Sequence, residues 1–124
     1  MRYLILCLLV LFCSTGVSFA HFGVVIPSTD IVSAEDSMQV GLEIKFIHPM
    51  ELTYMEMAKP KEFGVVTRGK RINLYDTLRE TKRECVDPQQ NFTYWLSDFR
   101  IKRPGDHTFY MVPQPYWEPA EDLF

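Results

Sequence analysis

The clearest structural signal in this sequence is the alternation in residues 38–48, which read MQVGLEIKFIH. Apolar side chains occupy every second position from Met38 onward, and polar or small residues lie between them as far as Lys45. Because successive side chains of a β-strand point to opposite faces, this alternation predicts a half-buried strand. His48 continues the series of every-second residues and is therefore expected on the apolar face of the strand. Pro49 ends the strand because proline cannot donate to the hydrogen-bond ladder.

The rest of the sequence contains further short apolar segments that are separated by turn residues. Residues 68–70 (RGK) and 104–105 (PG) have the composition of tight turns, and residues 77–80 (TLRE) match a helix-capping box. Closely spaced strands with little helix favour an all-β fold, namely an antiparallel β-sandwich that is immunoglobulin-like or related. The expected strands are residues 22–26, 38–48, 63–67, 71–75, 92–102 and 107–112.

The N-terminal segment has the pattern of a secretory signal peptide. Arg2 carries the only charge before Asp30, and residues 3–13 form an apolar run. Small residues then precede a cleavage position after Ala20. The apolar run is shorter than the about 20 residues that a membrane-spanning helix needs. We therefore expect residues 1–20 to be removed during export, with an uncleaved membrane anchor as the alternative.

Residues 21–124 would then form one exported β-sandwich domain. Cys85 is the only cysteine outside the expected signal peptide. No internal disulfide is therefore expected, and the domain must be held together by its core. The sequence ends at Phe124 in an apolar, aromatic segment, which leaves two expectations open: the N-terminal part of a longer domain, or a natural C-terminus.

Charge and motifs exclude several classes of function. The 13 Lys and Arg residues against 16 Asp and Glu residues give a formal net charge of −3, which offers no basic excess for a nucleic-acid backbone. The sequence contains no G-x-S-x-G motif, no H-E-x-x-H motif and no phosphate-binding loop. We therefore expect no nucleic-acid partner and no enzymatic activity.

Cleavage after Ala20 would make His21 the new N-terminal residue. Its α-amino nitrogen and an imidazole nitrogen can then close a chelate ring on one metal ion. Nitrogen donors of this kind suit copper and nickel, followed by cobalt and zinc. His21 is therefore the first candidate metal ligand.

Two further histidines are candidate metal ligands. If the strand after His21 pairs antiparallel with the strand that ends at His48, the start of one strand lies beside the end of the other. The two imidazoles can then share an ion. His107 begins the last expected strand and is the third candidate, with an ordinary solvated side chain as the alternative.

Three methionines follow His48 closely in the sequence. The thioethers of Met50, Met55 and Met57 are possible ligands for Cu(I). Flexible methionine side chains more often fill gaps in a core. We therefore expect them to pack in the core rather than to bind copper.

Six short segments follow one another in an order that has a counterpart in a known family. The segments are residues 20–27 (AHFGVVIP), 46–51 (FIHPME), 57–65 (MAKPKEFGV), 69–78 (GKRINLYDTL), 104–110 (PGDHTFY) and 115–122 (PYWEPAED). Together they resemble a bacterial periplasmic family of unknown function that is associated with nickel and cobalt uptake and is described as a periplasmic component of cobalt/nickel transport systems. Members of that family continue into further strands with another histidine, so the resemblance implies a truncated member.

The resemblance implies a periplasmic β-sandwich that handles a transition metal. The resulting expectation is a binding protein that captures Ni²⁺ or Co²⁺ and presents it to the components of a membrane metal transporter. Contact with the membrane would occur only through that transporter or an uncleaved signal peptide. Copper is the alternative metal, in a carrier or an oxidative enzyme that uses the N-terminal histidine chelate. The remaining alternative is a structural or interaction module without a metal.

Overall fold

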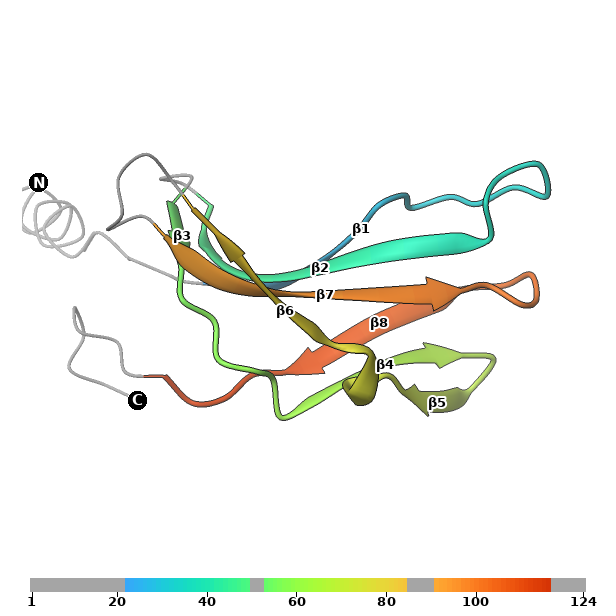
Figure 1. The fold of residues 1–124 in the computed structure, drawn as a ribbon. Coiled ribbons are helices and arrows are strands. Elements are labelled where there is room, and N and C mark those ends of the chain that lie inside the picture. Colours follow the sequence, from blue (N-terminus) through green and yellow to red (C-terminus); the bar gives the residue numbers. More distant parts are fainter. Residues whose placement is uncertain (1–21, 50–52, 85–90, 117–124) are drawn as a thin grey trace, which may run out of the picture.

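The computed structural model describes residues 22–49, 53–84 and 91–116, in which there are eight strands and one short 3-10 helix (Figure 1). The strands are β1 (Phe22–Pro27), β2 (Gln39–His48), β3 (Thr53–Met55), β4 (Glu62–Thr67), β5 (Lys70–Asn73), β6 (Arg79–Arg83), β7 (Phe92–Arg100) and β8 (His107–Val112), and the helix is η1 (Tyr75–Thr77). In the described part of the chain, no helix has the length and hydropathy to cross a membrane.

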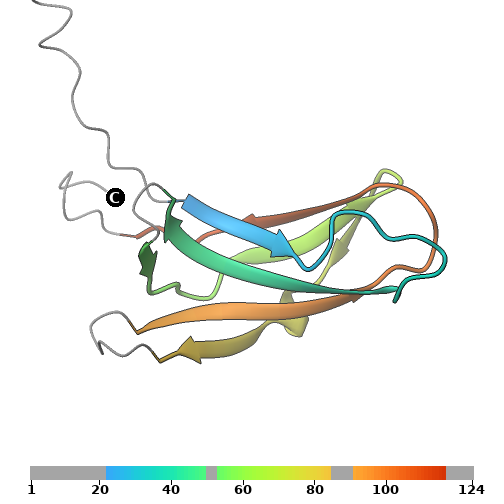
Figure 2. The ribbon, with the colours of Figure 1, turned by 90° about the horizontal axis from the view of Figure 1, so that it is seen from above.

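The strands form two antiparallel sheets that pack face to face (Figure 1; Figure 2). The larger sheet has five strands in the order β1-β2-β7-β6, with β3 also paired to β2. The smaller sheet has three strands in the order β5-β4-β8. The expected all-β antiparallel sandwich is therefore confirmed.

Strand β2 has the alternating burial that its sequence predicts. Along it, every second residue is buried and each residue between two of these is partly exposed. Ile44 lies opposite Val25 of β1 and Trp95 of β7, so the buried Ile44 and Trp95 and the partly buried Val25 meet on one face. The buried residues of β2 are Val40, Leu42, Ile44, Phe46 and His48.

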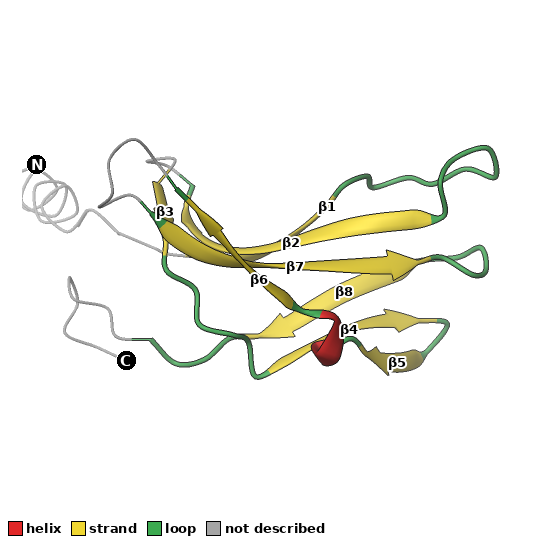
Figure 3. Ribbon diagram, in the orientation of Figure 1, coloured by secondary structure: helices red, strands yellow, loops and turns green. Residues whose placement is uncertain are grey.

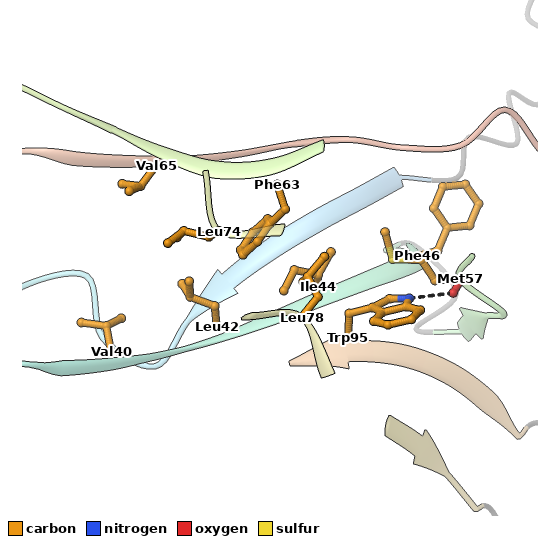
Figure 4. Close-up of a cluster of buried hydrophobic side chains, with 10 residues drawn as sticks. All are labelled: Val40, Leu42, Ile44, Phe46, Met57, Phe63, Val65, Leu74, Leu78 and Trp95. Atoms are coloured by element: carbon orange, nitrogen blue, oxygen red, sulfur yellow. Dashed lines mark hydrogen bonds between the residues drawn. The ribbon is translucent and has the colours of Figure 1, made fainter. Parts of the chain in front are cut away.

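The core lies between the two sheets, where β2 faces β4 and the chain around η1 (Figure 4). The indole Nε1–H of Trp95 donates a 3.0 Å hydrogen bond to the carbonyl oxygen of Met57, which satisfies a buried polar group. Burying one large apolar side chain stabilises the folded state by about 1.5–3 kcal/mol. The core residues are Val40, Leu42, Ile44, Phe46, Met57, Phe63, Val65, Leu74, Leu78 and Trp95.

The predicted helix cap at residues 77–80 is wrong. Thr77 ends η1, and its hydroxyl donates to the carbonyl oxygen of Leu74 instead of capping a new helix. Glu80 lies in β6 opposite Trp95, because strand pairing with β7 overrides the weak local preference of the segment. Figure 3 shows η1 as the short helical turn before β6.

The predicted turn between β4 and β5 is confirmed. Arg68 and Gly69 connect the paired residues Thr67 and Lys70, and both have positive φ angles of 51° and 73°. Two such residues in succession give a two-residue hairpin loop whose twist matches that of the flanking strands. The hairpin projects the Arg68 side chain at one end of the sandwich, where it is exposed.

Candidate functional site

His48 is the last residue of β2 and lies at the end of the sandwich where β1 begins. Its exposed fraction is 5%, and it shares the buried face of β2 with Phe46. Thr53 of β3 lies directly opposite it in the larger sheet. We call this region, with β3 and the start of β1, the His48 end.

The pairing of β1 with β2 brings the start of β1 to the His48 end. Phe22 lies opposite Ile47, and Gly23 lies opposite Phe46, in an antiparallel register. The predicted pairing of these two strands is thus confirmed. His21 itself lies outside the described residues, but it directly precedes Phe22 just as His48 directly follows Ile47.

The register of β1 and β2 also indicates which residues at the start of β1 face the core. Gly23 faces the smaller sheet, because a Cβ added to it would collide with the end of the Met111 side chain of β8. A side chain at this position would therefore require the flexible end of Met111 to move. At the start of β1, the face on which Gly23 lies is therefore the core face.

A small cavity lies beside Phe46 at the His48 end. It has a volume of about 40 Å³ and is lined by residues 56–58 and 113–116 in addition to Phe46. The Phe46 and Tyr116 rings meet edge to face with centroids 4.5 Å apart. Glu56 supplies the one carboxylate of this lining, and its Oε2 accepts a 2.8 Å hydrogen bond from the backbone N–H of Thr93.

His107 lies at the opposite end of the sandwich from His48. It pairs with Thr67 at the start of β8, and its ring lies 5.5 Å from that of Phe99. Phe99 is paired with Val40, which is eight residues before His48 on β2. At about 3.3 Å per residue, this spacing corresponds to about 26 Å. One metal ion therefore cannot bind both His48 and His107.

We call this second region, with the β1–β2, β4–β5 and β7–β8 connections, the His107 end (Figure 1). Because a carbonyl oxygen only accepts, the 2.8 Å contact of His107 Nδ1 with the Gly105 carbonyl oxygen makes Nδ1 the protonated nitrogen. Nε2 is then the nitrogen that remains as an acceptor in the neutral ring.

A cavity of about 550 Å³ adjoins His107, and several positively charged side chains line it. It is lined by four cationic side chains and one carboxylate, that of Asp98. This environment opposes the binding of a metal cation at His107. We call it the cationic cavity, and its lining residues are Thr67, Arg68, Ile72, Leu74, Asp98, Phe99, Arg100, Lys102, Arg103 and His107.

The three methionines occupy different environments. Met57 is buried in the core with an exposed fraction of 5%, and Met55 packs against that core. The predicted core role is therefore confirmed for these two residues, while Met50 lies outside the described residues. Within residues 22–49, 53–84 and 91–116, no group of three or more His, Cys, Asp or Glu side chains is placed to hold a metal ion.

The cationic cavity was not predicted from the sequence. Its signal is visible in two short basic segments, residues 68–71 (RGKR) and 100–103 (RIKR), which follow or precede turns. Nothing in the sequence shows that these segments meet, because one belongs to the smaller sheet and the other follows β7 of the larger sheet.

Comparison with known proteins gives one match. A protein-family model described as "Domain of unknown function (DUF4198)" matches residues 18–124. No curated protein and no solved structure matches the chain.

Proposed function

The chain belongs to the DUF4198 family, and from that premise and the geometry of the His48 end we propose that it is an exported protein that binds Ni²⁺ or Co²⁺. His21, freed as the N-terminal residue by cleavage after Ala20, would chelate the ion through its α-amino and imidazole nitrogens. His48 would add a further imidazole. The ion is the cargo of the protein, which would deliver it in the periplasm to a membrane metal transporter.

The observation that supports this proposal is the register of β1 and β2. Phe22 and Ile47 are the last described pair of this ladder, and one further pair would join positions 21 and 48. Directly opposite residues of an antiparallel pair have Cβ atoms about 4.5–5.5 Å apart, which is a distance that two imidazoles can bridge through one ion. Gly23 and the buried His48 side chain both lie on the core face, so a β1 strand extended by one residue would bring His21 to that face as well.

The charges that line the nearest cavities also differ between the two ends, although His48 itself does not line the cavity at its end. The small cavity at the His48 end contains the carboxylate of Glu56 and is otherwise lined by residues without charge. The cavity beside His107 contains four cations. A metal cation is therefore electrostatically favoured at the His48 end, and we do not include His107 in the proposed site.

The experiment is a calorimetric titration of Ni²⁺, Co²⁺ and Cu²⁺ into the chain that begins at His21. The matched control is the same chain with one Ala before His21, which removes the α-amino donor from the chelate and leaves every other residue in place. We expect the control to lose at least about tenfold in affinity, because one of the chelating nitrogens is gone. Equal affinity of the two chains in a folded sample would contradict the proposal.

Replacing His48 by Ala tests the second imidazole. We expect a further loss of metal affinity, while far-UV circular dichroism shows whether the sandwich still forms. Copper is expected to bind more tightly than nickel to any such nitrogen site. Tight copper binding alone would therefore not identify the physiological metal, and oxygen consumption in the presence of copper and a reductant would identify the oxidative-enzyme alternative.

A further inference from the structure

The cationic cavity lies between the two sheets, at a place where the larger sheet is incomplete. Arg79 of β6 pairs with Leu96 of β7, and within the described residues no β6 residue continues that pairing toward Arg100. The chain before β6 instead crosses to the smaller sheet through η1. The gap leaves the end of β7 facing the β4–β5 hairpin, with the cavity between them.

The cavity is lined mainly by positive charges, whereas the whole chain has a negative net charge. Four of the 13 Lys and Arg residues line it, although the chain as a whole carries a formal net charge of −3. The cations come from three places in the sequence: Arg68 from the β4–β5 turn, Arg100 from the end of β7, and Lys102 and Arg103 from the β7–β8 connection. Their concentration is therefore produced by the fold rather than by one basic segment.

The four cations are not neutralised by ion pairs within the described residues. The recorded ion pairs there are Lys45 with Glu43 and Arg79 with Asp98. The single carboxylate of the cavity is therefore already engaged by Arg79 from outside the lining. Like charges held within the Debye length, about 8 Å at physiological ionic strength, repel one another, and an anion would relieve this repulsion.

The cavity also has an apolar wall that a simple inorganic ion would leave uncovered. Leu74 is buried at 8% exposure, Ile72 is exposed at 41%, and the partly buried Phe99 ring packs against His107. A volume of about 550 Å³ falls in the usual range for sites that bind small organic molecules. Cations at the rim with apolar residues beside them match a ligand that has both acidic groups and an apolar body.

We propose that the cationic cavity binds a small organic anion that carries two carboxylate groups on an apolar body. Arg68 on the smaller sheet and Arg103 beyond the larger one contribute cations from two different sides, which is the arrangement that two carboxylates require. Each guanidinium can bind a carboxylate through two parallel hydrogen bonds. This site is at the His107 end and does not depend on the proposed metal site.

The test is a calorimetric titration of the purified protein with isophthalate, an aromatic dicarboxylate, and with sulfate, which has no apolar body. We expect isophthalate to bind at least about tenfold more tightly than sulfate, because only isophthalate covers the apolar wall. Amide chemical shifts should change at Gly69 and Gly105, which flank the cavity in the β4–β5 turn and the β7–β8 connection.

Matched charge variants locate the binding site. Arg68→Gln and Arg103→Gln should each weaken isophthalate binding about tenfold, because each removes charge-assisted hydrogen bonds to a carboxylate. Lys70→Gln removes a cation from the same hairpin that does not line the cavity, and it should change the affinity by less than about twofold. All three positions are exposed, so the fold should be preserved.

Three results would overturn the proposal. One is the absence of isophthalate binding at millimolar concentration. Another is an equal loss in the Lys70→Gln control, which would indicate general electrostatic attraction without a site. The third is binding to phosphatidylglycerol vesicles with no binding of isophthalate, which would assign the cations to a membrane surface.

Discussion

The two ends of the sandwich each present a histidine at a strand terminus, but they surround it differently. His48 ends β2 on the core face, and Phe46, two residues before it, lines a small cavity whose lining includes Glu56. His107 begins β8 beside a larger cavity that four cations line. The same residue type therefore lies at the end that we propose for a metal cation in one case and beside a cluster of cations in the other.

This difference shows that a histidine is not a metal ligand by its chemistry alone. The charges that other elements bring to it decide which ion is favoured. At the His107 end these charges come from the β4–β5 turn and from the segment after β7, which meet only in the folded chain.

The largest effect is expected on the free energy of unfolding, from a substitution in β2, the strand that both ends of the sandwich share. Ile44 is fully buried at the middle of β2, which extends from one end of the sandwich to the other. Ile44→Ala should lower the free energy of unfolding by about 2–5 kcal/mol, because it removes apolar burial and leaves a cavity. Urea unfolding followed by circular dichroism measures this loss, and a loss below about 1 kcal/mol would mean that β2 is not the central support.

The next effect separates the two histidines directly. His48→Ala should weaken Ni²⁺ binding about tenfold or more, whereas His107→Ala should leave it within about twofold, because the two residues lie at opposite ends of the sandwich. Calorimetric titration of both variants of the chain that begins at His21 gives the comparison. Similar losses in the two variants would contradict the assignment of the metal to the His48 end.

A smaller effect concerns the stability of the His107 end without a ligand. The double variant Arg68→Gln with Arg103→Gln should raise the free energy of unfolding by about 0.5 kcal/mol at low salt, because it relieves repulsion among exposed cations. The gain should vanish in 1 M NaCl, where charges are screened over a few ångströms. Destabilisation of the double variant at low salt would show that these arginines stabilise the fold and are not repelled by one another in the absence of an anion.

The smallest expected effect is a pH dependence of protein stability that arises in the loop between β1 and β2. Hydrogen bonds from the Ser33 hydroxyl and the Ser33 backbone N–H lower the pKa of Asp36 below its ordinary value. A carboxyl whose pKa is depressed by folding stabilises the protein above its unfolded pKa and loses this contribution as the pH falls through the folded pKa.

The Asp36→Asn substitution tests this contribution. The wild-type protein should lose slightly more stability than the variant when thermal unfolding is followed from pH 6 down to about pH 3. Parallel curves for the two proteins would show that the Ser33–Asp36 contact is not maintained in solution.

Most of the fold could be predicted from the sequence because its strands carry local signals. The alternation in β2 and the Arg68–Gly69 turn each depend on a few neighbouring residues, and both are found as expected. Strand β3 was missed because it has only three residues, and β6 was missed because its polar sequence forms a strand only by pairing with β7. Pairing of this kind is a tertiary effect that local propensity does not contain.

The candidate sites could be predicted only in part. The adjacency of the start of β1 and the end of β2 follows from sequential strand pairing, so the pairing of Phe22 with Ile47 next to His48 could be predicted. The distance between His48 and His107 could not be predicted, because it depends on which end of the sandwich each strand terminus reaches. The cationic cavity could not be predicted for the same reason.

The most direct test of the account is to observe where a paramagnetic ion binds. Co²⁺ added to the ¹⁵N-labelled chain that begins at His21 broadens the amide signals of residues near it. We expect broadening at Phe22, Ile47 and Thr53 of the His48 end, with the amides of Gly69 and Gly105 unaffected at the other end. Broadening centred on Gly105 and His107 would contradict the proposed metal site. The Co²⁺ ion would then lie at the His107 end, where the cationic side chains should repel it.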